Sequence, residues 1–162
     1  CFGREFKDIL ISVQAINRSG DILTIPAKDI IFEYRSCGLP KDLIFLSASF
    51  KGKKKERKKI EEEVNSLKIK KEKNQPTRIK TGGSTFKNPI KQTNKKVWEI
   101  IKQSVPNDIS FGDAAISNKH TNFFINKGNA SYKDMKKLID YVKESVKNKT
   151  GVNLDLEIIL VE

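Results

Sequence analysis

The segment 82–89 reads Gly-Gly-Ser-Thr-Phe-Lys-Asn-Pro and has the composition of a small ligand-binding loop. Two adjacent glycines permit close approach of the backbone to a ligand and leave the following serine hydroxyl exposed on a tight turn. The lysine adds a cation, and the asparagine adds an amide that both donates and accepts hydrogen bonds. The candidate residues are Gly82, Gly83, Ser84, Lys87 and Asn88. From residue types alone, an ordinary Gly-Ser turn remains the simpler interpretation.

Several familiar sites do not fit this chain. The loop is not a Walker A motif, because the spacing and the Gly-Lys-Ser ending are missing. A Ser-His-Asp hydrolase has little support, since His120 is the only histidine and no Gly-x-Ser-x-Gly motif is present. Cys1 and Cys37 lack zinc-ligand spacing and are too few for a disulfide framework. We therefore expect two free thiols in a reducing compartment and no metal site.

Two charged residues lie beside apolar segments. Arg35 follows one such segment, and its planar guanidinium would suit a carboxylate or a phosphate. Glu157 lies among leucines and isoleucines, where its carboxylate could be partly buried. Simpler interpretations remain open: a surface ion pair for Arg35, the solvent face of an edge strand for Glu157, and a hydrogen-bonded structural role for His120.

Apolar alternation predicts five strands, the first two forming a hairpin and the third buried on both faces at its start. They are expected at 8–16, 22–25, 43–50, 120–126 and 154–161. A short helical turn is expected at 26–31 and a loop at 75–94. Because the order of strands and helices shows no strict βαβ repeat, the predicted class is α+β.

Three helices are predicted, at 53–73, 97–104 and 131–150. The first is a charge run with apolar residues at i, i+4 and i+7, as in a surface helix joining two lobes. The third has a capping signature, with Ser131 as N-cap and Asp134 three residues later, and Gly151 is well placed to end it.

Length and composition bound the possibilities. The 162 residues suit one domain or two small lobes, and 37% hydrophobic with 32% charged residues is a globular composition. No run approaches the roughly 18 apolar residues of a membrane span, so we expect a cytoplasmic protein without a membrane partner. The chain does not begin with Met, and we expect its natural N-terminus upstream. A net charge of +12 would attract polyanions, either nucleic acid or a nucleotide diphosphate, and of the two we expect the nucleotide diphosphate and no nucleic-acid partner.

Five separated blocks, in the same order, resemble the MurB family of UDP-N-acetylenolpyruvoylglucosamine reductases. The most specific is Gly-Ser-x-Phe-Lys-Asn-Pro, ending at Pro89, and Phe-Glu-Tyr-Arg-Ser, ending at Ser36, is similar to the family's Tyr-Arg-x-Ser motif. The blocks lie at 1–8, 32–36, 75–89, 116–126 and 151–158. The absence of a long insertion between Pro89 and the helix around Trp98 resembles the shorter, type II branch.

The resemblance implies a division of the chain into four parts. Residues 1–52 would be the C-terminal remnant of a PCMH-type FAD-binding domain, and 53–74 a charged linker helix. Residues 75–151 would form the α+β substrate-binding domain, and 152–162 a final strand returning to the FAD-binding domain. Most of the FAD-binding domain would then lie outside this segment.

The resemblance also implies an activity: reduction of UDP-N-acetylglucosamine enolpyruvate to UDP-N-acetylmuramate with FAD and NADPH, in peptidoglycan synthesis. Ser84 would donate a proton to C2 of the enolpyruvyl group. Arg35 and a protonated Glu157 would stabilise the negative charge that develops there. Because serine is a weak acid, it would need a nearby cation, either Lys87 or the pair Lys71 and Lys73.

Further implied contacts complete the expected site. The substrate would be held by Tyr34, Lys73, Lys87, Asn88 and His120, and the cofactor would approach Gly82 and Gly83. We expect Arg35, Ser84 and Glu157 to converge on one cleft, and the full-length enzyme to be a monomer. Two alternatives stay open: an inactive truncated or split-gene product, and a basic nucleic-acid-binding module, which explains the charge but leaves 82–89 without purpose.

Overall fold

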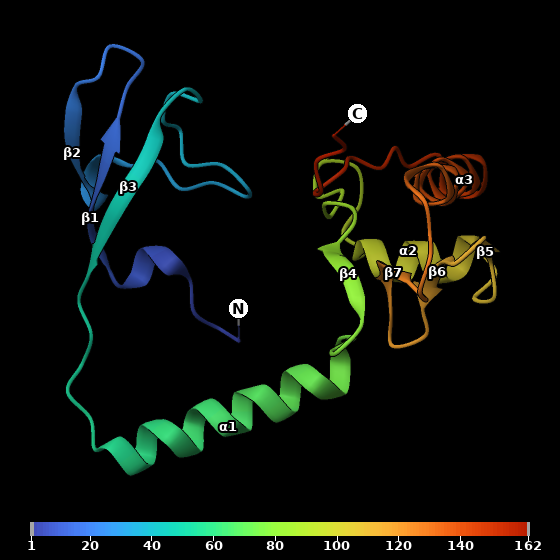
Figure 1. The fold of residues 1–162 in the computed structure, drawn as a ribbon, viewed down its shortest axis with the longest axis horizontal. Coiled ribbons are helices and arrows are strands. Elements are labelled where there is room, and N and C mark those ends of the chain that lie inside the picture. Colours follow the sequence, from blue (N-terminus) through green and yellow to red (C-terminus); the bar gives the residue numbers. More distant parts are fainter. Residues whose placement is uncertain (1, 162) are drawn as a thin grey trace. The chain divides into compact units, whose positions relative to one another are not determined.

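The computed structural model describes residues 2–161, which form two compact units, one ending at Val64 and the other beginning at Asn65. Figure 1 shows the elements of each unit. Both units contain an antiparallel sheet, and helices accompany the sheet of the second unit. The predicted α+β class is therefore confirmed.

The first unit is built on a three-stranded antiparallel sheet with the order β2-β1-β3. Its strands are β1 (Leu10–Ile16), β2 (Ile22–Pro26) and β3 (Ile44–Phe50), and short 3₁₀-helices lie at Phe6–Asp8 and Ala27–Asp29. The predicted hairpin is confirmed, and Asn17 and Asp21 hold its turn through side-chain hydrogen bonds of 2.9 Å. The predicted third strand and short helical turn are confirmed as well.

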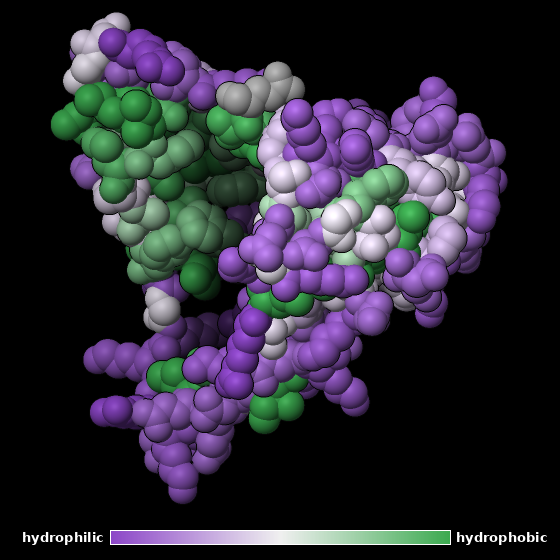
Figure 2. Space-filling model, turned by 45° about the vertical axis from the view of Figure 1, so that its right-hand side comes forward, coloured by the Kyte–Doolittle hydropathy of each residue, from purple (hydrophilic) through white to green (hydrophobic). Residues whose placement is uncertain are grey.

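The burial expected at the start of β3 is wrong. Every residue of this strand is exposed, and Ile44, Phe45 and Leu46 each keep more than half of their surface. The reason is topological: β3 is an edge strand that pairs only with β1, and the small core of this unit consists of Leu10, Val13 and Ile30. Figure 2 shows apolar side chains gathered on the visible face of the first unit.

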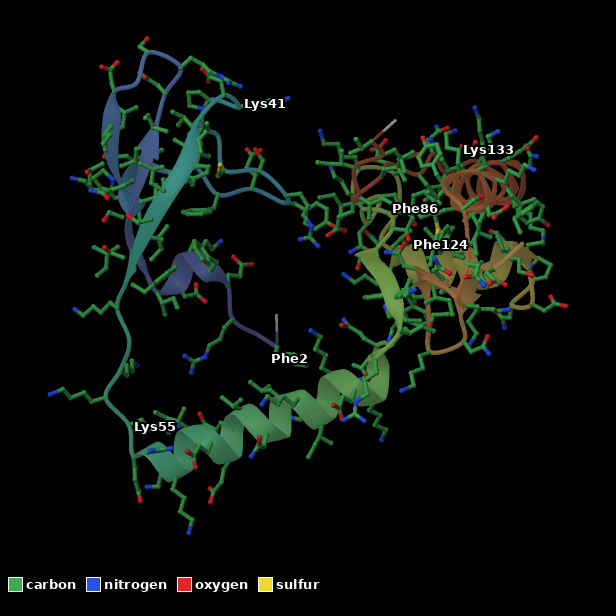
Figure 3. The ribbon with its side chains drawn as sticks, in the orientation of Figure 1. Phe2, Lys41, Lys55, Phe86, Phe124 and Lys133 are labelled. Atoms are coloured by element: carbon green, nitrogen blue, oxygen red, sulfur yellow. The ribbon has the colours of Figure 1, made fainter. Side chains whose placement is uncertain are left out.

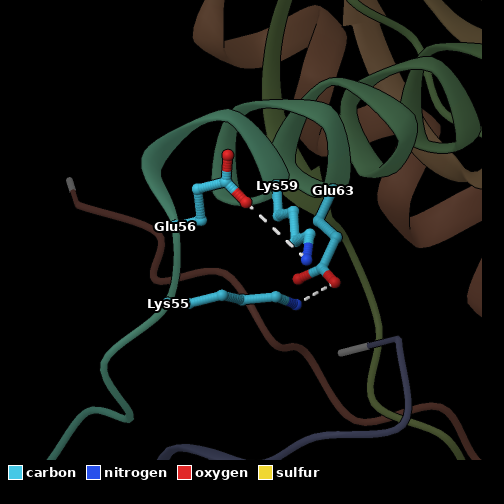
Figure 4. Close-up of polar contacts among 4 residues, drawn as sticks. All are labelled: Lys55, Glu56, Lys59 and Glu63. Atoms are coloured by element: carbon cyan, nitrogen blue, oxygen red, sulfur yellow. Dashed lines mark hydrogen bonds and ion pairs between the residues drawn. The ribbon is translucent and has the colours of Figure 1, made fainter.

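Helix α1 (Arg57–Asn74) confirms the predicted charged helix. None of its residues is buried, and its apolar positions Ile60 and Val64 are 43% exposed. Ion pairs hold its first turns: Lys55 pairs with Glu63, and Lys59 lies 3.6 Å from Glu56 (Figure 4). It is a surface helix, as expected, and its role as a linker stays a prediction.

The second unit contains a four-stranded antiparallel sheet with the order β4-β7-β6-β5. Its elements are β4 (Lys80–Ser84), α2 (Val97–Ser104), β5 (Ser110–Phe111), β6 (Ala114–Ser117), β7 (His120–Asn126) and α3 (Tyr132–Thr150). Helix α2 contacts β7 and α3, and α3 contacts β5 and β6. The predicted α2, β7 and α3 are confirmed. Strand β4 lies inside the segment expected to be a loop, and β5 and β6 were not predicted.

Packing in the second unit explains its helices. The 3.6-residue period predicted for α3 places Leu138, Ile139, Val142 and Val146 in the core. Its predicted ends are also confirmed: the amide of Asp134 donates to the Ser131 hydroxyl at 3.2 Å, and Gly151 ends the helix at φ +73°. The core also takes Phe86 and Phe124, whose rings meet edge to face at 5.7 Å (Figure 3).

The continuous strand expected at 154–161 is wrong. Only Leu156 forms a bridge, with Phe86, while Val152 and Leu154 are buried in the core of the second unit. The segment opposite Leu156 begins after Ser84, where regular pairing of β4 ends, so the two segments form one isolated bridge instead of a continuous ladder. The assignment of 152–162 to an FAD-binding domain stays a prediction.

Within residues 2–161, no helix combines the length and apolarity needed to cross a membrane, and no cluster of His, Cys, Asp and Glu could hold a metal ion. Cys37 is a free, half-buried thiol, whereas Cys1 lies outside the described residues.

Candidate substrate and catalytic site

The candidate loop begins at an irregular end of β4. The pairing of β4 with β7 shifts register between Thr81 and Ser84, so that Ser84 lies opposite Phe123. The Thr81 hydroxyl stabilises this irregularity, because it donates to the carbonyl of Phe124 at 2.7 Å and accepts from the amide of Gly83 at 3.2 Å. Ser84 is therefore presented from a fixed backbone.

The two glycines of the loop have different surroundings. Gly83 has φ +87°, a conformation that favours glycine, and a Cβ built on it meets no heavy atom within 4 Å. A Cβ on Gly82 would make an ordinary contact of 3.5 Å with Ile158. Open space against the backbone is thus found at Gly83, where a ligand could approach closely.

Residues 85–87 continue from Ser84 as a strip bonded on both sides. On one side, the carbonyl and the buried side chain of Asn122 bond to the backbone of Thr85 and Phe86. On the other side, the amide of Glu157 donates to the carbonyl of Thr85 at 2.8 Å, and the amide of Lys87 donates to the carbonyl of Asp155 at 2.9 Å. Two segments far apart in sequence are therefore neighbours.

This arrangement brings two of the predicted catalytic residues together. Ser84 is half-buried and directly precedes Thr85, whose carbonyl holds the half-buried Glu157. Lys87 is half-buried two residues beyond Thr85. Ser84, Lys87 and Glu157 therefore share one region of the second unit, and their chemical roles stay predictions.

Asn88 has a structural contact that the sequence did not indicate. Its side-chain carbonyl accepts a hydrogen bond of 3.0 Å from the amide of Val97, the first residue of α2. This bond satisfies one of the amides that a helix start leaves without an intrahelical partner. Asn88 thus ties the end of the loop to α2, and its contact with a substrate stays a prediction.

Arg35 lies on a tight turn of the first unit. Glu33 and Ser36 exchange backbone hydrogen bonds of 2.9 and 3.2 Å, and Arg35 between them has φ +59°. Its guanidinium lies 4.8 Å from the centre of the Tyr34 ring, a cation–π contact. Because Tyr34 and Arg35 belong to the first unit, their convergence with the residues of the second unit on one cleft stays a prediction.

His120 borders a cavity of about 420 Å³ in the second unit. Burial lowers the pKa of His120 below its usual value, so the imidazole is neutral at pH 7. Its ring lies 6.3 Å from that of Trp98, and its Nδ1 accepts from the amide of Asn122 at 3.3 Å. The lining includes Asn74, Trp98, Lys102, Asn107, Lys119 and His120. Lys73 is exposed at the end of α1, next to Asn74.

The presence of Trp98 and Lys102 in the lining of this cavity, with His120, was not predicted from the sequence. Trp98 was assigned only to a helix, and Lys102 was not singled out. The helical period gave a usable signal, since Trp98 and Lys102 are four residues apart and share a face of α2. No local pattern could place that face beside His120, because strand β7 begins sixteen residues after α2 ends.

Comparison with known proteins identifies the family. Residues 75–161 match the model of the family described as UDP-N-acetylenolpyruvoylglucosamine reductase, C-terminal domain. The chain is 64% identical to the UDP-N-acetylenolpyruvoylglucosamine reductase of Pelagibacter ubique over all 162 residues, which cover 54% of that relative. It is 41% identical to that of Rickettsia conorii over 157 residues, which make up 97% of this chain and 52% of the relative.

A solved structure agrees with these matches. The crystal structure of UDP-N-acetylenolpyruvylglucosamine reductase (MurB) from Thermus caldophilus aligns with a TM-score of 0.75 at 28% identity, covering 93% of this chain and 52% of the other. The chain thus spans about half the length of the relatives that it matches. These matches show that the chain belongs to the UDP-N-acetylenolpyruvoylglucosamine reductase family and contains its C-terminal domain.

Proposed function

We propose that this chain is the substrate-handling part of a reductase that converts UDP-N-acetylglucosamine enolpyruvate to UDP-N-acetylmuramate, with FAD and NADPH, for peptidoglycan synthesis. The observation that carries the proposal is the backbone link between Thr85 and Glu157, in a chain of this family. Through that link the backbone of Glu157 is bonded to the residue that follows Ser84, so a carboxyl group and a hydroxyl group belong to neighbouring segments. We propose further that the complete enzyme is a cytoplasmic monomer.

The surroundings of Gly83 fit the approach of a flat cofactor. The position has open space where a side chain would otherwise stand, and it directly precedes Ser84. When bound, FAD supplies the hydride that reaches the enolpyruvyl double bond, after NADPH has reduced it. The residues of this chain would orient the substrate beside the flavin and control the charge and the proton.

In the proposed reaction Ser84 donates a proton to C2 of the enolpyruvyl group. A serine hydroxyl is a weak acid, so the transfer needs a positive field at the oxygen. We propose that the half-buried Lys87, three residues further along the chain, supplies this field. Glu157, as a protonated donor, and Arg35 would stabilise the charge that develops at the substrate carboxylate.

The cavity beside His120 has the chemistry that a uridine diphosphate requires. Trp98 offers a partly exposed aromatic face to a base, while Lys102 and Lys119 offer positive charge to a diphosphate. His120 would contribute as a neutral hydrogen-bonding group because burial lowers its pKa. We therefore propose that the nucleotide end of the substrate binds in this cavity. Tyr34, Lys73 and Asn88 stay predicted contacts for the rest of the substrate.

A graft tests the proposal. The 162 residues would replace the matching half of the Pelagibacter ubique relative, and flavin content and NADPH oxidation would be measured with and without UDP-N-acetylglucosamine enolpyruvate. We expect bound flavin and NADPH oxidation that depends on the substrate, whereas the isolated chain should retain little flavin and oxidise no NADPH. A folded graft that binds flavin but shows no substrate-dependent oxidation would favour the inactive-product alternative.

A separate binding measurement tests the nucleic-acid-binding alternative. The isolated chain would be titrated with a single-stranded oligonucleotide and with UDP at physiological salt. We expect saturable binding of UDP that is lost in Lys102→Ala, and only weak, salt-sensitive binding of the oligonucleotide. Tight binding of the oligonucleotide that persists at higher salt would support the nucleic-acid-binding alternative.

A further inference from the structure

Asn122 holds the strip that carries the proposed site. Its side chain is only 3% exposed and bonds to both backbone groups of one residue: Oδ1 accepts from the amide of Phe86 at 3.0 Å, and Nδ2 donates to the carbonyl of Phe86 at 2.8 Å. Its own backbone carbonyl accepts from the amide of Thr85 at 2.8 Å. Three hydrogen bonds thus join a single residue of β7 to two consecutive residues of the strip.

The chemistry of the side chain explains why an asparagine stands at this position. Strand β4 pairs with β7 only as far as Ser84, so the backbone groups of Phe86 have no strand partner on this side. A carboxamide carries one acceptor and a donor on the same short side chain, and it replaces the missing rung of the ladder. An aspartate would lose the donor, and an aliphatic residue would lose both groups.

The bonds of Asn122 reach the proposed catalytic residues through the strip. Thr85 accepts from the amide of Glu157, and Ser84 directly precedes Thr85. A displacement of residues 85 and 86 would therefore shift Ser84 and Glu157 relative to each other. Phe86 stays attached in any case, because its ring is buried against Phe124. The Phe86 ring holds residues 85–87 against the core, and Asn122 fixes their position along β7.

We propose that Asn122 is a positioning residue that sets Ser84 against Glu157 for proton donation; this inference rests on the proposed function. Asn126 provides a matched control on the same strand. Its Oδ1 accepts from the amides of Gly128 and Ala130 at 2.8 and 2.9 Å, so these bonds hold the turn after β7 and not residues 85–87. Both residues are asparagines that bond to backbone, so loss of either one removes similar interactions.

The kinetic test compares Asn122→Ala and Asn126→Ala in the graft, by rapid mixing. For Asn122→Ala we expect the rate of flavin reoxidation by the enolpyruvyl substrate to fall about 10²-fold, because a misplacement of catalytic groups by about 1 Å has an effect of this size. Reduction by NADPH and the KM for substrate should stay within about twofold, and Asn126→Ala should change none of these rates. Asn122→Asp, which keeps the acceptor and loses the donor, should fall between. Equal effects of the two alanine variants would overturn the proposal.

A second measurement decides the matter even if the graft has no activity. Amide hydrogen exchange in the 162-residue chain reports the bond at Glu157, which Asn122 does not touch directly. We expect Asn122→Ala to speed exchange at this amide about tenfold, and Asn126→Ala to leave it unchanged. An unchanged Glu157 amide in Asn122→Ala would show that the asparagine only binds Phe86. Failure of the graft alone would reject the proposed function and leave this result standing.

Discussion

The two units of the chain differ in how much apolar surface they bury. The second unit packs α2 and α3 onto its sheet around fully buried side chains such as Ile101, Leu138 and Val142. The first unit buries only a small cluster around Val13, and β3 is exposed throughout. Burial of apolar area is the main favourable contribution to folding. Ser84 and Glu157 therefore belong to the better-stabilised unit, and Arg35 to the other.

Separating the units should give the largest effect. A fragment of residues 65–162 should unfold cooperatively in urea and give well-dispersed amide NMR signals, because its core lies within these residues. A fragment of residues 1–64 should show no cooperative transition, since so few of its side chains are buried. A sharp unfolding transition for the shorter fragment would break the comparison.

Single truncations should reproduce the contrast on a smaller scale. Ile101 is fully buried in α2, so Ile101→Ala should lower the free energy of unfolding by about 2–5 kcal/mol. Leu46→Ala removes similar atoms from β3, where the side chain is 52% exposed, and should cost within about 0.5 kcal/mol. Urea titrations of the two variants measure this difference, and similar losses would contradict the account.

The pH dependence of stability should give the smallest effect. Because burial lowers the pKa of His120 below the 6.5 of an unfolded histidine, the unfolded state binds more protons between the two values. Stability should therefore be complete above pH 6.5 and fall as the pH drops below it. The Ser131 hydroxyl lowers the pKa of Asp134 from 3.8. Any stability lost by protonation of that carboxylate is therefore lost only at a much more acidic pH.

Thermal unfolding at pH 7.5 and pH 5.5 measures the contribution of His120. The unmodified chain should lose stability between these values, and His120→Gln should lose less. Equal losses in both chains would mean that the imidazole is not desolvated and would remove the argument for a neutral His120 in the proposed nucleotide cavity.

Much of the fold could be predicted from the sequence where local signals agree. Helix α3 has both its capping residue Ser131 and its apolar period, and both ends lie where predicted. The hairpin at Asn17–Asp21 is equally local. The burial of β3 could not be predicted, because an apolar run looks the same in a central strand and in an edge strand. The strand predicted at 154–161 is wrong for a related reason, because the segment beside it, 85–87, is irregular.

The candidate site was predictable through the order of its motifs and not through its geometry. Residue types and surroundings make Ser84 and Glu157 candidates, the family resemblance implies their roles, and the backbone link through Thr85 brings the two segments together. The bonds of Asn122 and Asn88 depend on contacts across 36 and 9 residues. No periodicity or composition reports which side chain will complete an interrupted ladder.

The contrast between the units extends to Arg35. Arg35→Ala in the graft should weaken both substrate binding and flavin reoxidation, because a cation at the carboxylate acts before and during hydride transfer. Titration of the enolpyruvyl substrate against the flavin absorbance, with Ser84→Ala as reference, measures the first effect. Unchanged substrate affinity in Arg35→Ala would remove this residue from the binding site.

The most direct test of the account is Ser84→Ala in the graft, with the two half-reactions followed separately by rapid mixing. Reduction of the flavin by NADPH should proceed nearly unchanged. Reoxidation by UDP-N-acetylglucosamine enolpyruvate should slow by about 10²–10⁴-fold, the usual cost of a lost proton donor, while substrate affinity should move little. If Ser84→Ala slowed only the NADPH half-reaction, Ser84 would not be the proton donor, and the proposed role of the loop would be contradicted.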